Sequence, residues 1–316
     1  MTGTGPWSHI RQIASPVTRE MLRPLTTERV VQFREPLTDE EYRKVGRLLA
    51  GRPDVALRAY GLHVTDLEFL AHFPHVRRFQ ADYLSKIESL DGLRHLPDDL
   101  ESLILGEART ARQFSLRILE RFTGLKELYL EKHTKDIEVI GALTQLEDLT
   151  LRSITLPDLE ILLPLTRLQS LDLKLGGTKN LSLLPKIGRL RYVELWQVRG
   201  LSDISPVADL PHLQYLFLQS LRQVTHLPDM TRMPALRRVV LDTMKGITEL
   251  RPLAGAPALE QLLLVAMRQV TLDDLECLVG HPTLREAVFG LGSIKRNEAA
   301  YALVGVPHLA TDFEFN

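Results

Sequence analysis

Several features that would point to a particular class of protein are scarce or missing in this sequence. Among 316 residues there is one cysteine, Cys277, which excludes an internal disulfide framework and a multi-cysteine metal site. Aromatic residues make up only 6% of the chain. The 39 basic and 40 acidic residues leave a formal net charge of −1, which argues against nucleic-acid binding because such surfaces are visibly basic.

Long apolar runs and targeting signals are also missing. No stretch approaches the roughly 18 uncharged apolar residues that predict a membrane-spanning helix. The start of the chain, MTGTGPWSH, lacks the basic segment and apolar run of a secretory signal. We therefore expect a cytoplasmic protein without a membrane partner.

What the sequence does contain is a short hydrophobic motif that recurs along most of its length. From Leu125 the motif is LKELYL, with apolar residues at its first, fourth and sixth positions. Between Leu125 and Leu259, successive motifs begin 21, 22, 22, 23, 23 and 23 residues apart. The eleven motifs begin at Leu57, Val76, Leu100, Leu125, Leu146, Leu168, Leu190, Leu213, Leu236, Leu259 and Leu284. Such a period predicts a repeat architecture in which each unit packs against its neighbours.

A second apolar cluster follows each motif, as in Leu201–Leu213 (LSDISPVADLPHL) and Ile247–Leu253 (ITELRPL). With this second half, residues 57–306 resemble the leucine-rich repeat family, in particular its short bacterial, internalin-like type. Val224–Met230 (VTHLPDM) is similar to repeats of plant immune receptors. The resemblance implies an α/β fold: a leucine-rich-repeat solenoid (horseshoe) with a parallel β-sheet on the concave face and short helices or irregular segments on the convex face.

One position departs from the family pattern. The family often places Asn or Cys three residues after the LxL of the motif, where the side chain bonds to loop backbone. Here the corresponding residues are His133, Ile154, Gly176, Val198, Leu221, Met244 and Met267. We therefore expect apolar packing to hold these turns in place of an asparagine ladder.

The ends of a solenoid must cover its core, and the flanking segments suggest how this is done. Residues 1–28 have little periodicity and are expected to be a flexible tail. Residues 29–56 are expected to form a β-α cap, in which Arg29–Arg34 is a strand and Thr38–Glu41 is a capping box that opens a helix ending near Ala50. About eleven repeats then fill residues 57–306, and residues 307–316 are expected to be a C-terminal capping strand.

Side chains alternate along a strand, so the third, fifth and seventh positions of each motif are expected to face away from the core. Four aromatic residues gather at these positions on two adjacent strands, and Phe217, Val240, Leu263 and Val288 form an apolar stripe along the fifth position. Exposed apolar surface and aromatic anchors are typical of interaction sites. The predicted partner-binding residues are Tyr129, Tyr192, Glu194, Trp196, Tyr215, Phe217, Arg238, Val240, Asp242 and Leu263.

Acidic residues lie beside this surface and predict the charge of a partner. Glu127, Glu131, Asp148, Asp172 and Glu194 face only Arg152 and Lys174, which favours a locally basic partner with an apolar anchor. The alternatives are that the N-terminal tail or residues 307–316 cover the stripe, or that a homodimer buries it.

Searches for catalytic and metal-binding motifs give negative results. The sequence has no phosphate-binding loop, no GxSxG elbow and no HExxH helix. His72 and His75 lie close together, but Pro74 breaks a regular helix and no third metal ligand is placed. Cys277 is interpreted as a small core residue. We therefore expect neither enzyme activity, nor a metal, nor a cofactor.

The sequence thus favours a non-catalytic module that binds a protein or peptide through its concave face. A bacterial immunity protein or an adaptor is the narrower hypothesis. The alternatives are a substrate-recognition or accessory subunit of an enzyme, for example one that holds a precursor peptide, and a homodimeric scaffold.

Overall fold

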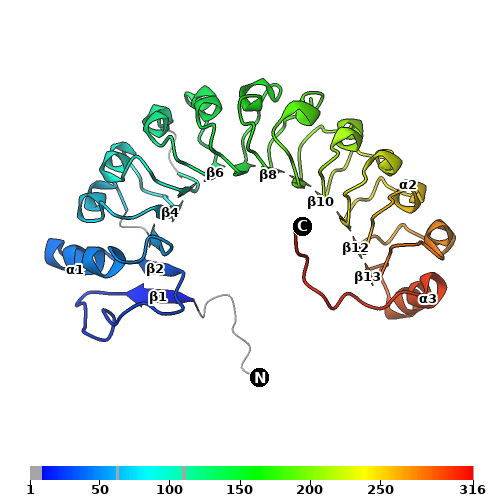
Figure 1. Ribbon diagram of the computed structural model, residues 1–316, viewed down its shortest axis with the longest axis horizontal. Helices are drawn as coiled ribbons and strands as arrows, with labels where there is room; N and C mark the ends of the chain where they lie inside the picture. Colours follow the sequence, from blue (N-terminus) through cyan, green and yellow to red (C-terminus); the bar gives the residue numbers. More distant parts are fainter. Residues whose placement is uncertain (1–8, 62–63, 109–111, 316) are drawn as a thin grey trace. The chain divides into compact units, whose positions relative to one another are not determined.

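The computed structural model describes residues 9–61, 64–108 and 112–315, and it divides into two compact units, Met1–Leu146 (unit 1) and Glu147–Asn316 (unit 2). Both units repeat one element: a short strand, a tight turn and a return segment that contains a short helix (Figure 1). The eleven strands β3 to β13 fall on the eleven motifs, so the predicted α/β solenoid repeat is confirmed in each unit.

The described residues of unit 1 hold one parallel sheet, made of β1 Ile10–Ile13, β2 Val30–Phe33, β3 Ala56–Tyr60, β4 Arg78–Tyr83, β5 Ser102–Leu105 and β6 Glu127–Glu131. Its helices are α1 Asp39–Leu49 and the 3₁₀ helices η1 Glu68–His72, η2 Asp91–His95, η3 Arg117–Arg121 and η4 Ile137–Ala142.

The described residues of unit 2 hold a second parallel set, made of β7 Asp148–Arg152, β8 Ser170–Lys174, β9 Tyr192–Trp196, β10 Tyr215–Gln219, β11 Arg238–Asp242, β12 Gln261–Val265 and β13 Glu286–Phe289. Its helices are η5 Glu160–Leu162, η6 Leu184–Lys186, η7 Ser205–Asp209, η8 Met230–Arg232, α2 Arg251–Ala254, η9 Asp273–Leu278 and α3 Ile294–Val304. Within unit 2, the strands line the inner, concave side and the helices the outer side (Figure 1).

The core of each unit lies between its strands and its return segments. The fourth and sixth residues of the motif point inward, as Leu216 and Leu218 of β10 show with no exposed surface. The return contributes the opposite wall, for example Val207 of η7, which is also fully buried. Because the 18 residues between β9 and β10 must climb only one strand spacing of about 4.8 Å, such a return accommodates short 3₁₀ helices better than long α-helices.

A left-handed residue follows each of the strands β6 to β12. These residues have φ between 48° and 64° and are Lys132, Ser153, Leu175, Gln197, Ser220, Thr243 and Ala266. The turn that they make directs the next side chain into the core. There His133, Ile154, Val198, Leu221, Met244 and Met267 are all less than 5% exposed, so apolar packing holds these turns, as expected. His133 is the polar exception, and its Nε2 lies 2.9 Å from the carbonyl oxygen of Gly106, to which it donates.

At Gly176 the same position leaves no room for a side chain. A Cβ built there would lie 1.9 Å from the carbonyl oxygen of Ile154. Glycine is therefore required at this turn by the close approach of the neighbouring repeat.

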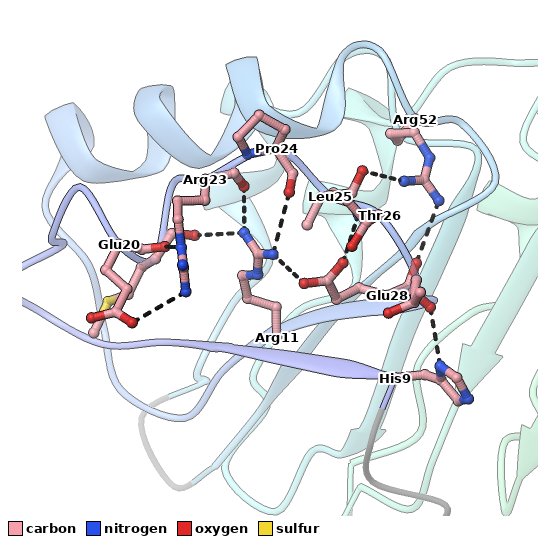
Figure 2. A network of polar contacts seen from close by, with 11 residues as sticks. His9, Arg11, Glu20, Arg23, Pro24, Leu25, Thr26, Glu28 and Arg52 are labelled. Carbon is pink, nitrogen blue, oxygen red and sulfur yellow. Dashed lines mark hydrogen bonds and ion pairs between the residues drawn. The ribbon is translucent and has the colours of Figure 1, made fainter. Parts of the chain in front are cut away.

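The N-terminal cap begins earlier than expected. Residues 1–8 lie outside the described residues, but Ile10–Ile13 form β1, which pairs in parallel with β2. Figure 2 shows how the following loop is held: the Arg11 guanidinium donates to the carbonyl oxygens of Met21, Arg23 and Pro24, and forms an ion pair with Glu28. This part of the chain differs from the flexible tail expected over residues 1–28.

Helix α1 closes the end of the cap. Its predicted capping box is confirmed, because Thr38 Oγ1 accepts from the backbone N–H of Glu41 at 3.3 Å and the Glu41 carboxylate accepts from the N–H of Thr38 at 2.9 Å. The same carboxylate also accepts from the hydroxyl of Ser15 at 3.0 Å and the N–H of Val17 at 2.8 Å. Glu41 thus fixes the segment after β1 onto α1.

The C-terminal segment differs from the capping strand expected over residues 307–316. A single parallel bridge joins His308 to Ala287 of β13. Beyond it the described residues form no strand but cross the concave face of unit 2 (Figure 1). Asn316 lies outside the described residues.

Candidate partner-binding surface

The outward positions of the motif line up in three rows across the sheet of unit 2. In the third row, Tyr192, Tyr215, Arg238 and Gln261 are register partners on β9 to β12. The fifth row aligns Glu194, Phe217, Val240 and Leu263, and the seventh aligns Trp196, Gln219, Asp242 and Val265. Nine of the ten predicted partner-binding residues are therefore brought together on four adjacent strands. The tenth, Tyr129, lies on β6 in unit 1.

The aromatic residues fall into separate contacts rather than one cluster. Tyr192 and Tyr215 meet edge to face, with ring centroids 4.9 Å apart and an interplanar angle of 76°. Trp196 lies four residues further along β9, where the guanidinium carbon of Arg152 is 5.1 Å from its ring centroid. Two aromatic contacts of different chemistry therefore occupy the two ends of β9.

The apolar stripe is in register but is not an open patch. Val240 is 3% exposed, and Phe217, Leu263 and Val288 are half-buried. Phe217 and Leu263 are the register partners of Val240 on the neighbouring strands. The expectation that this stripe is a broad exposed apolar surface is therefore wrong. Its side chains pack against the neighbouring rows and expose little surface to a partner.

Two of the acidic residues beside the stripe, Asp172 and Glu194, are largely buried and are paired with Lys174. Asp172 is 8% exposed and Glu194 is 9% exposed. Lys174 Nζ lies 2.9 Å from Asp172 Oδ2 and 2.9 Å from Glu194 Oε2. Asp172 also accepts from the hydroxyl of Thr150 at 3.1 Å, and Glu194 from that of Tyr192 at 2.8 Å. One cation thus offsets half of the charge of this pair.

Burial shifts the acid–base behaviour of this group. It raises the pKa of Asp172 to about 6, even though Lys174 acts in the opposite direction. Burial also raises the pKa of Tyr192, and the carboxylates of Asp172 and Glu194 add to the shift. Burial by itself lowers the pKa of Lys174, but the two carboxylates outweigh it and the net direction is upward. Tyr192 and Lys174 therefore stay protonated and act as donors.

The C-terminal segment lies on the third row and was not expected there. The ring of Phe313 meets Tyr215 with centroids 5.2 Å apart, and the ring of Phe315 meets Tyr192 at 6.5 Å. Thr311 Oγ1 donates to Glu286 at 2.5 Å and accepts from Gln261 Nε2 at 2.9 Å. Residues 307–316 were considered from the sequence as a covering of the fifth row; in the structure, Thr311, Phe313 and Phe315 cover the third row instead.

Two arginines that sequence reasoning missed hold this segment. Arg191 and Arg237 directly precede β9 and β11, at the second position of the motif. Their guanidinium carbons lie 5.3 Å from the ring centroid of Phe315 and 5.4 Å from that of Phe313. The outward-facing residues were predicted from the third, fifth and seventh positions, so the second position was not considered. The alternating pattern DFEF near the end of the chain could have indicated that this segment packs on the sheet.

A cavity of about 770 Å³ remains between the segment and the sheet, bounded by residues of β7 to β11 and by Asp312, Phe313 and Phe315. Four buried side-chain atoms on the concave face of unit 2 have no hydrogen-bond partner: Asp172 Oδ1, Trp196 Nε1, Arg238 Nε and Gln261 Oε1. A buried polar group without a partner costs about 1–3 kcal/mol, so a ligand that satisfied these atoms would gain binding energy.

Known structures show what this arrangement is similar to. An internalin of Listeria monocytogenes, InlF, has 18% sequence identity over 89% of this chain and 79% of its own, with a TM-score of 0.57. A leucine-rich-repeat protein of Leptospira interrogans matches at 16% identity over 96% of this chain and 94% of its own, with a TM-score of 0.53. The functional domain of InlJ from Listeria monocytogenes, described as including a cysteine ladder, matches at 19% identity over 82% of this chain and 52% of its own, with a TM-score of 0.52.

The chain has the leucine-rich-repeat fold. No protein-family model matches the sequence, and comparison with curated proteins finds no significant relative. The likeness therefore lies in the repeat geometry.

In this leucine-rich-repeat chain, local contacts explain the two places where the sequence could suggest chemistry, His72 and Cys277. His72 Nε2 lies 3.4 Å from Asp39 Oδ1 and the ring stacks on Tyr42, and in the described part of the chain no three or more His, Cys, Asp or Glu residues are placed to hold a metal ion. Cys277 is half-buried in η9, where burial raises the pKa of its thiol. Within residues 9–61, 64–108 and 112–315, no helix is both long and apolar enough to cross a membrane.

Proposed function

We propose that this protein is a non-catalytic module that binds a protein or peptide on the concave face of unit 2. The observation that carries the proposal is that this face already holds a peptide segment, residues 311–315, against the rings of Tyr192 and Tyr215. Aromatic side chains are efficient anchors because they contribute large contact area at a small cost in conformational entropy.

Each row of the surface has a role in this proposal. Tyr192, Tyr215 and Arg238 contact the backbone or rings of the partner, and the Trp196 ring, packed against Arg152, forms the other side of the surface. Phe217, Val240 and Leu263 form the floor. Asp242 accepts from Gln219 at 2.9 Å and fixes that amide at the edge of the surface.

A catalytic role finds no support in the ionisable groups of this face. Asp172 and Glu194 share Lys174 as their partner, and Tyr192 donates to Glu194. These contacts hold the groups in place rather than leaving one poised next to a reacting atom. The absence of a cofactor, the cytoplasmic location and the immunity or adaptor role remain predictions from the sequence.

Co-purification from the native host tests the proposal. Tagged wild-type protein is compared with F217E and with I104E, which places the same charge at the matching fifth position of β5 in unit 1. The protein captured by wild type is then purified and its affinity for each form is measured. Since a hot-spot residue contributes about 2 kcal/mol or more, we expect F217E to weaken binding by at least about 30-fold.

The control and the solution mass decide between the outcomes. I104E should retain the partner, and both variants should remain folded at the temperature of the binding assay. Full affinity in F217E would refute the proposal. A wild-type dimer that F217E dissociates would instead assign the surface to the homodimeric scaffold considered from the sequence.

A further inference from the structure

The contacts that the C-terminal segment makes with the sheet indicate which features a ligand of this surface would have. Thr311 contacts β12 and β13, Phe313 contacts β10 and β11, and Phe315 contacts β9. Alternate residues thus touch successive strands, as in an extended chain whose odd-numbered side chains face the sheet. The two phenylalanine rings also meet each other edge to face, with centroids 5.0 Å apart.

Three arginines, Arg191, Arg237 and Arg238, lie beside the two rings. The Arg238 guanidinium carbon lies 5.8 Å from the ring centroid of Phe313 and 5.0 Å from that of Tyr215. Arg237 adds a hydrogen bond of 2.9 Å to the carbonyl oxygen of Glu314, while it also pairs with Glu260 at 2.8 Å. Arginine beside an aromatic ring is attractive in itself and also favours carboxylates next to that ring. Asp312 and Glu314 are such carboxylates, and both are exposed.

The segment fills this site incompletely. Phe315 keeps 47% of its surface exposed, the cavity of about 770 Å³ remains beside it, and Arg238 Nε lacks a hydrogen-bond partner. A better ligand would bury its second aromatic ring and reach Arg238 with an acceptor. The seated segment is therefore a partial match for what the surface recognises.

We propose that this surface, defined by Tyr192, Tyr215, Arg191, Arg237 and Arg238, binds a short acidic segment with two aromatic side chains two positions apart, and that residues 311–315 occupy it as an intramolecular competitor. The proposal rests on the function proposed above and names its partner class. It replaces the locally basic partner expected from the sequence, because Lys174 pairs with Asp172 and Glu194 while the arginines face the aromatic rings.

A tethered segment competes strongly. On a short flexible linker its effective concentration is on the order of millimolar. A free peptide with the same intrinsic affinity therefore binds the wild-type protein weakly. When the segment no longer occupies the surface, the apparent affinity of the free peptide increases.

The test uses the full chain and a fluorescent peptide, Thr-Asp-Phe-Glu-Phe, followed by fluorescence anisotropy. We expect F313A/F315A to bind this probe at least about tenfold more tightly than the wild type, because the competitor has lost its anchors. Adding Y215A to that variant should abolish binding. Y83A in the same background, which removes an exposed aromatic residue of β4 in unit 1, should bind as the double variant does.

Two further peptides test the chemistry. A peptide with alanine in place of both phenylalanines should not bind, and one with lysine in place of both acidic residues should bind at least about tenfold more weakly, since its charge opposes the arginines. Tighter binding of the lysine peptide would restore the locally basic partner and overturn the inference.

The remaining outcomes separate this inference from the proposed function. If F313A/F315A is folded and does not bind the acidic peptide, the inference is wrong. If F217E nevertheless loses the co-purified partner, the concave surface still binds a protein, but one of different chemistry. Equal affinity of wild type and F313A/F315A would refute the competitor role of the C-terminal segment.

Discussion

Asp172 has an ionisable carboxyl group in a largely buried position. It is a carboxylate on the open face of a sheet, yet it is 8% exposed, and burial raises its pKa to about 6. An aspartate in an unfolded chain has a pKa of about 4. Between these values the folded protein binds more protons than the unfolded one, so the contribution of Asp172 to stability decreases as the pH rises from 4 to 6.

We predict that D172N removes this part of the pH dependence. The cost of ionising Asp172 in the folded protein is at most about 3 kcal/mol, fully present above pH 6 and absent below pH 4. The difference in unfolding free energy between D172N and wild type should therefore increase in favour of D172N across this interval. Urea unfolding at pH 4, 5, 6 and 7 measures it. A difference that does not change with pH would show that Asp172 titrates in the folded protein as it does in the unfolded chain.

The residue types predicted which motif positions point into the core, but they predicted the backbone conformation of the turns only in part. Leucines at the fourth and sixth positions are buried wherever the motif is regular, because alternation alone decides which way they point. The left-handed residues after the strands could not be found in this way. Leu175 and Thr243 adopt φ of 58° and 54° although neither is glycine or asparagine. The stacked neighbours impose that backbone, and a single repeat does not encode it.

At the scale of elements, the N-terminal cap depends on one buried arginine. The side chain of Arg11 is 14% exposed, and it bonds to three carbonyl oxygens of the loop between β1 and β2 as well as to Glu28 (Figure 2). Although burial acts in the opposite direction, hydrogen bonds from the backbone N–H groups of Thr26 and Glu28 and from Arg11 lower the pKa of Glu28 to about 2. The ion pair therefore persists in mildly acidic solution.

We predict that R11A releases this loop while the rest of unit 1 stays folded. In R11A three carbonyl oxygens of the loop and the Glu28 carboxylate lose their charged donor, and local opening exposes the loop to proteases. Limited trypsin digestion should cleave R11A after Arg19 at least about tenfold faster than wild type, since Pro24 protects the bond after Arg23. The matched control is the removal of an exposed arginine, R29A, whose partner is Asp54 at 3.1 Å. Equal cleavage of R11A and wild type would show that the loop is held by other contacts.

The elements at the two ends were the least predictable part of the sequence. The helix α1 was found because a capping box is a local signal. The strand β1 has four residues, IRQI, too few to show a period, and its place depends on the distant carbonyl oxygens that Arg11 contacts. The C-terminal segment alternates like a strand, but its phenylalanines prefer the tyrosines of β9 and β10 to a further place in the sheet.

At the scale of the whole molecule, the candidate surface was predictable because a repeat converts sequence position into spatial position. Once the period was known, nine of the ten candidate residues could be placed on four adjacent strands. Exposure and charge pairing could not be placed in this way, since they depend on which long side chains reach across rows. Lys174 and Arg237 show this: each bonds to carboxylates on a neighbouring strand or repeat.

The same one-dimensional order limits how far a perturbation spreads. Within unit 2, consecutive strands pair with each other, and strands three places apart are separated by about 14 Å. Stability should then be a sum of repeat terms and nearest-neighbour terms. Three fully buried residues allow a test within unit 2: Leu149 on β7, Leu216 on β10 and Val239 on β11, the last two being register partners.

We predict that L216A and V239A interact and that L149A and L216A do not. Neighbours that share one cavity should deviate from additivity by about 0.5–3 kcal/mol, whereas the distant pair should add to within about 0.5 kcal/mol. Each leucine variant alone should cost about 2–5 kcal/mol, so urea unfolding of the singles and doubles resolves the difference. A coupling for L149A/L216A as large as for L216A/V239A would mean that unit 2 unfolds as one tightly coupled body, and that a ligand on its concave face stabilises every repeat equally.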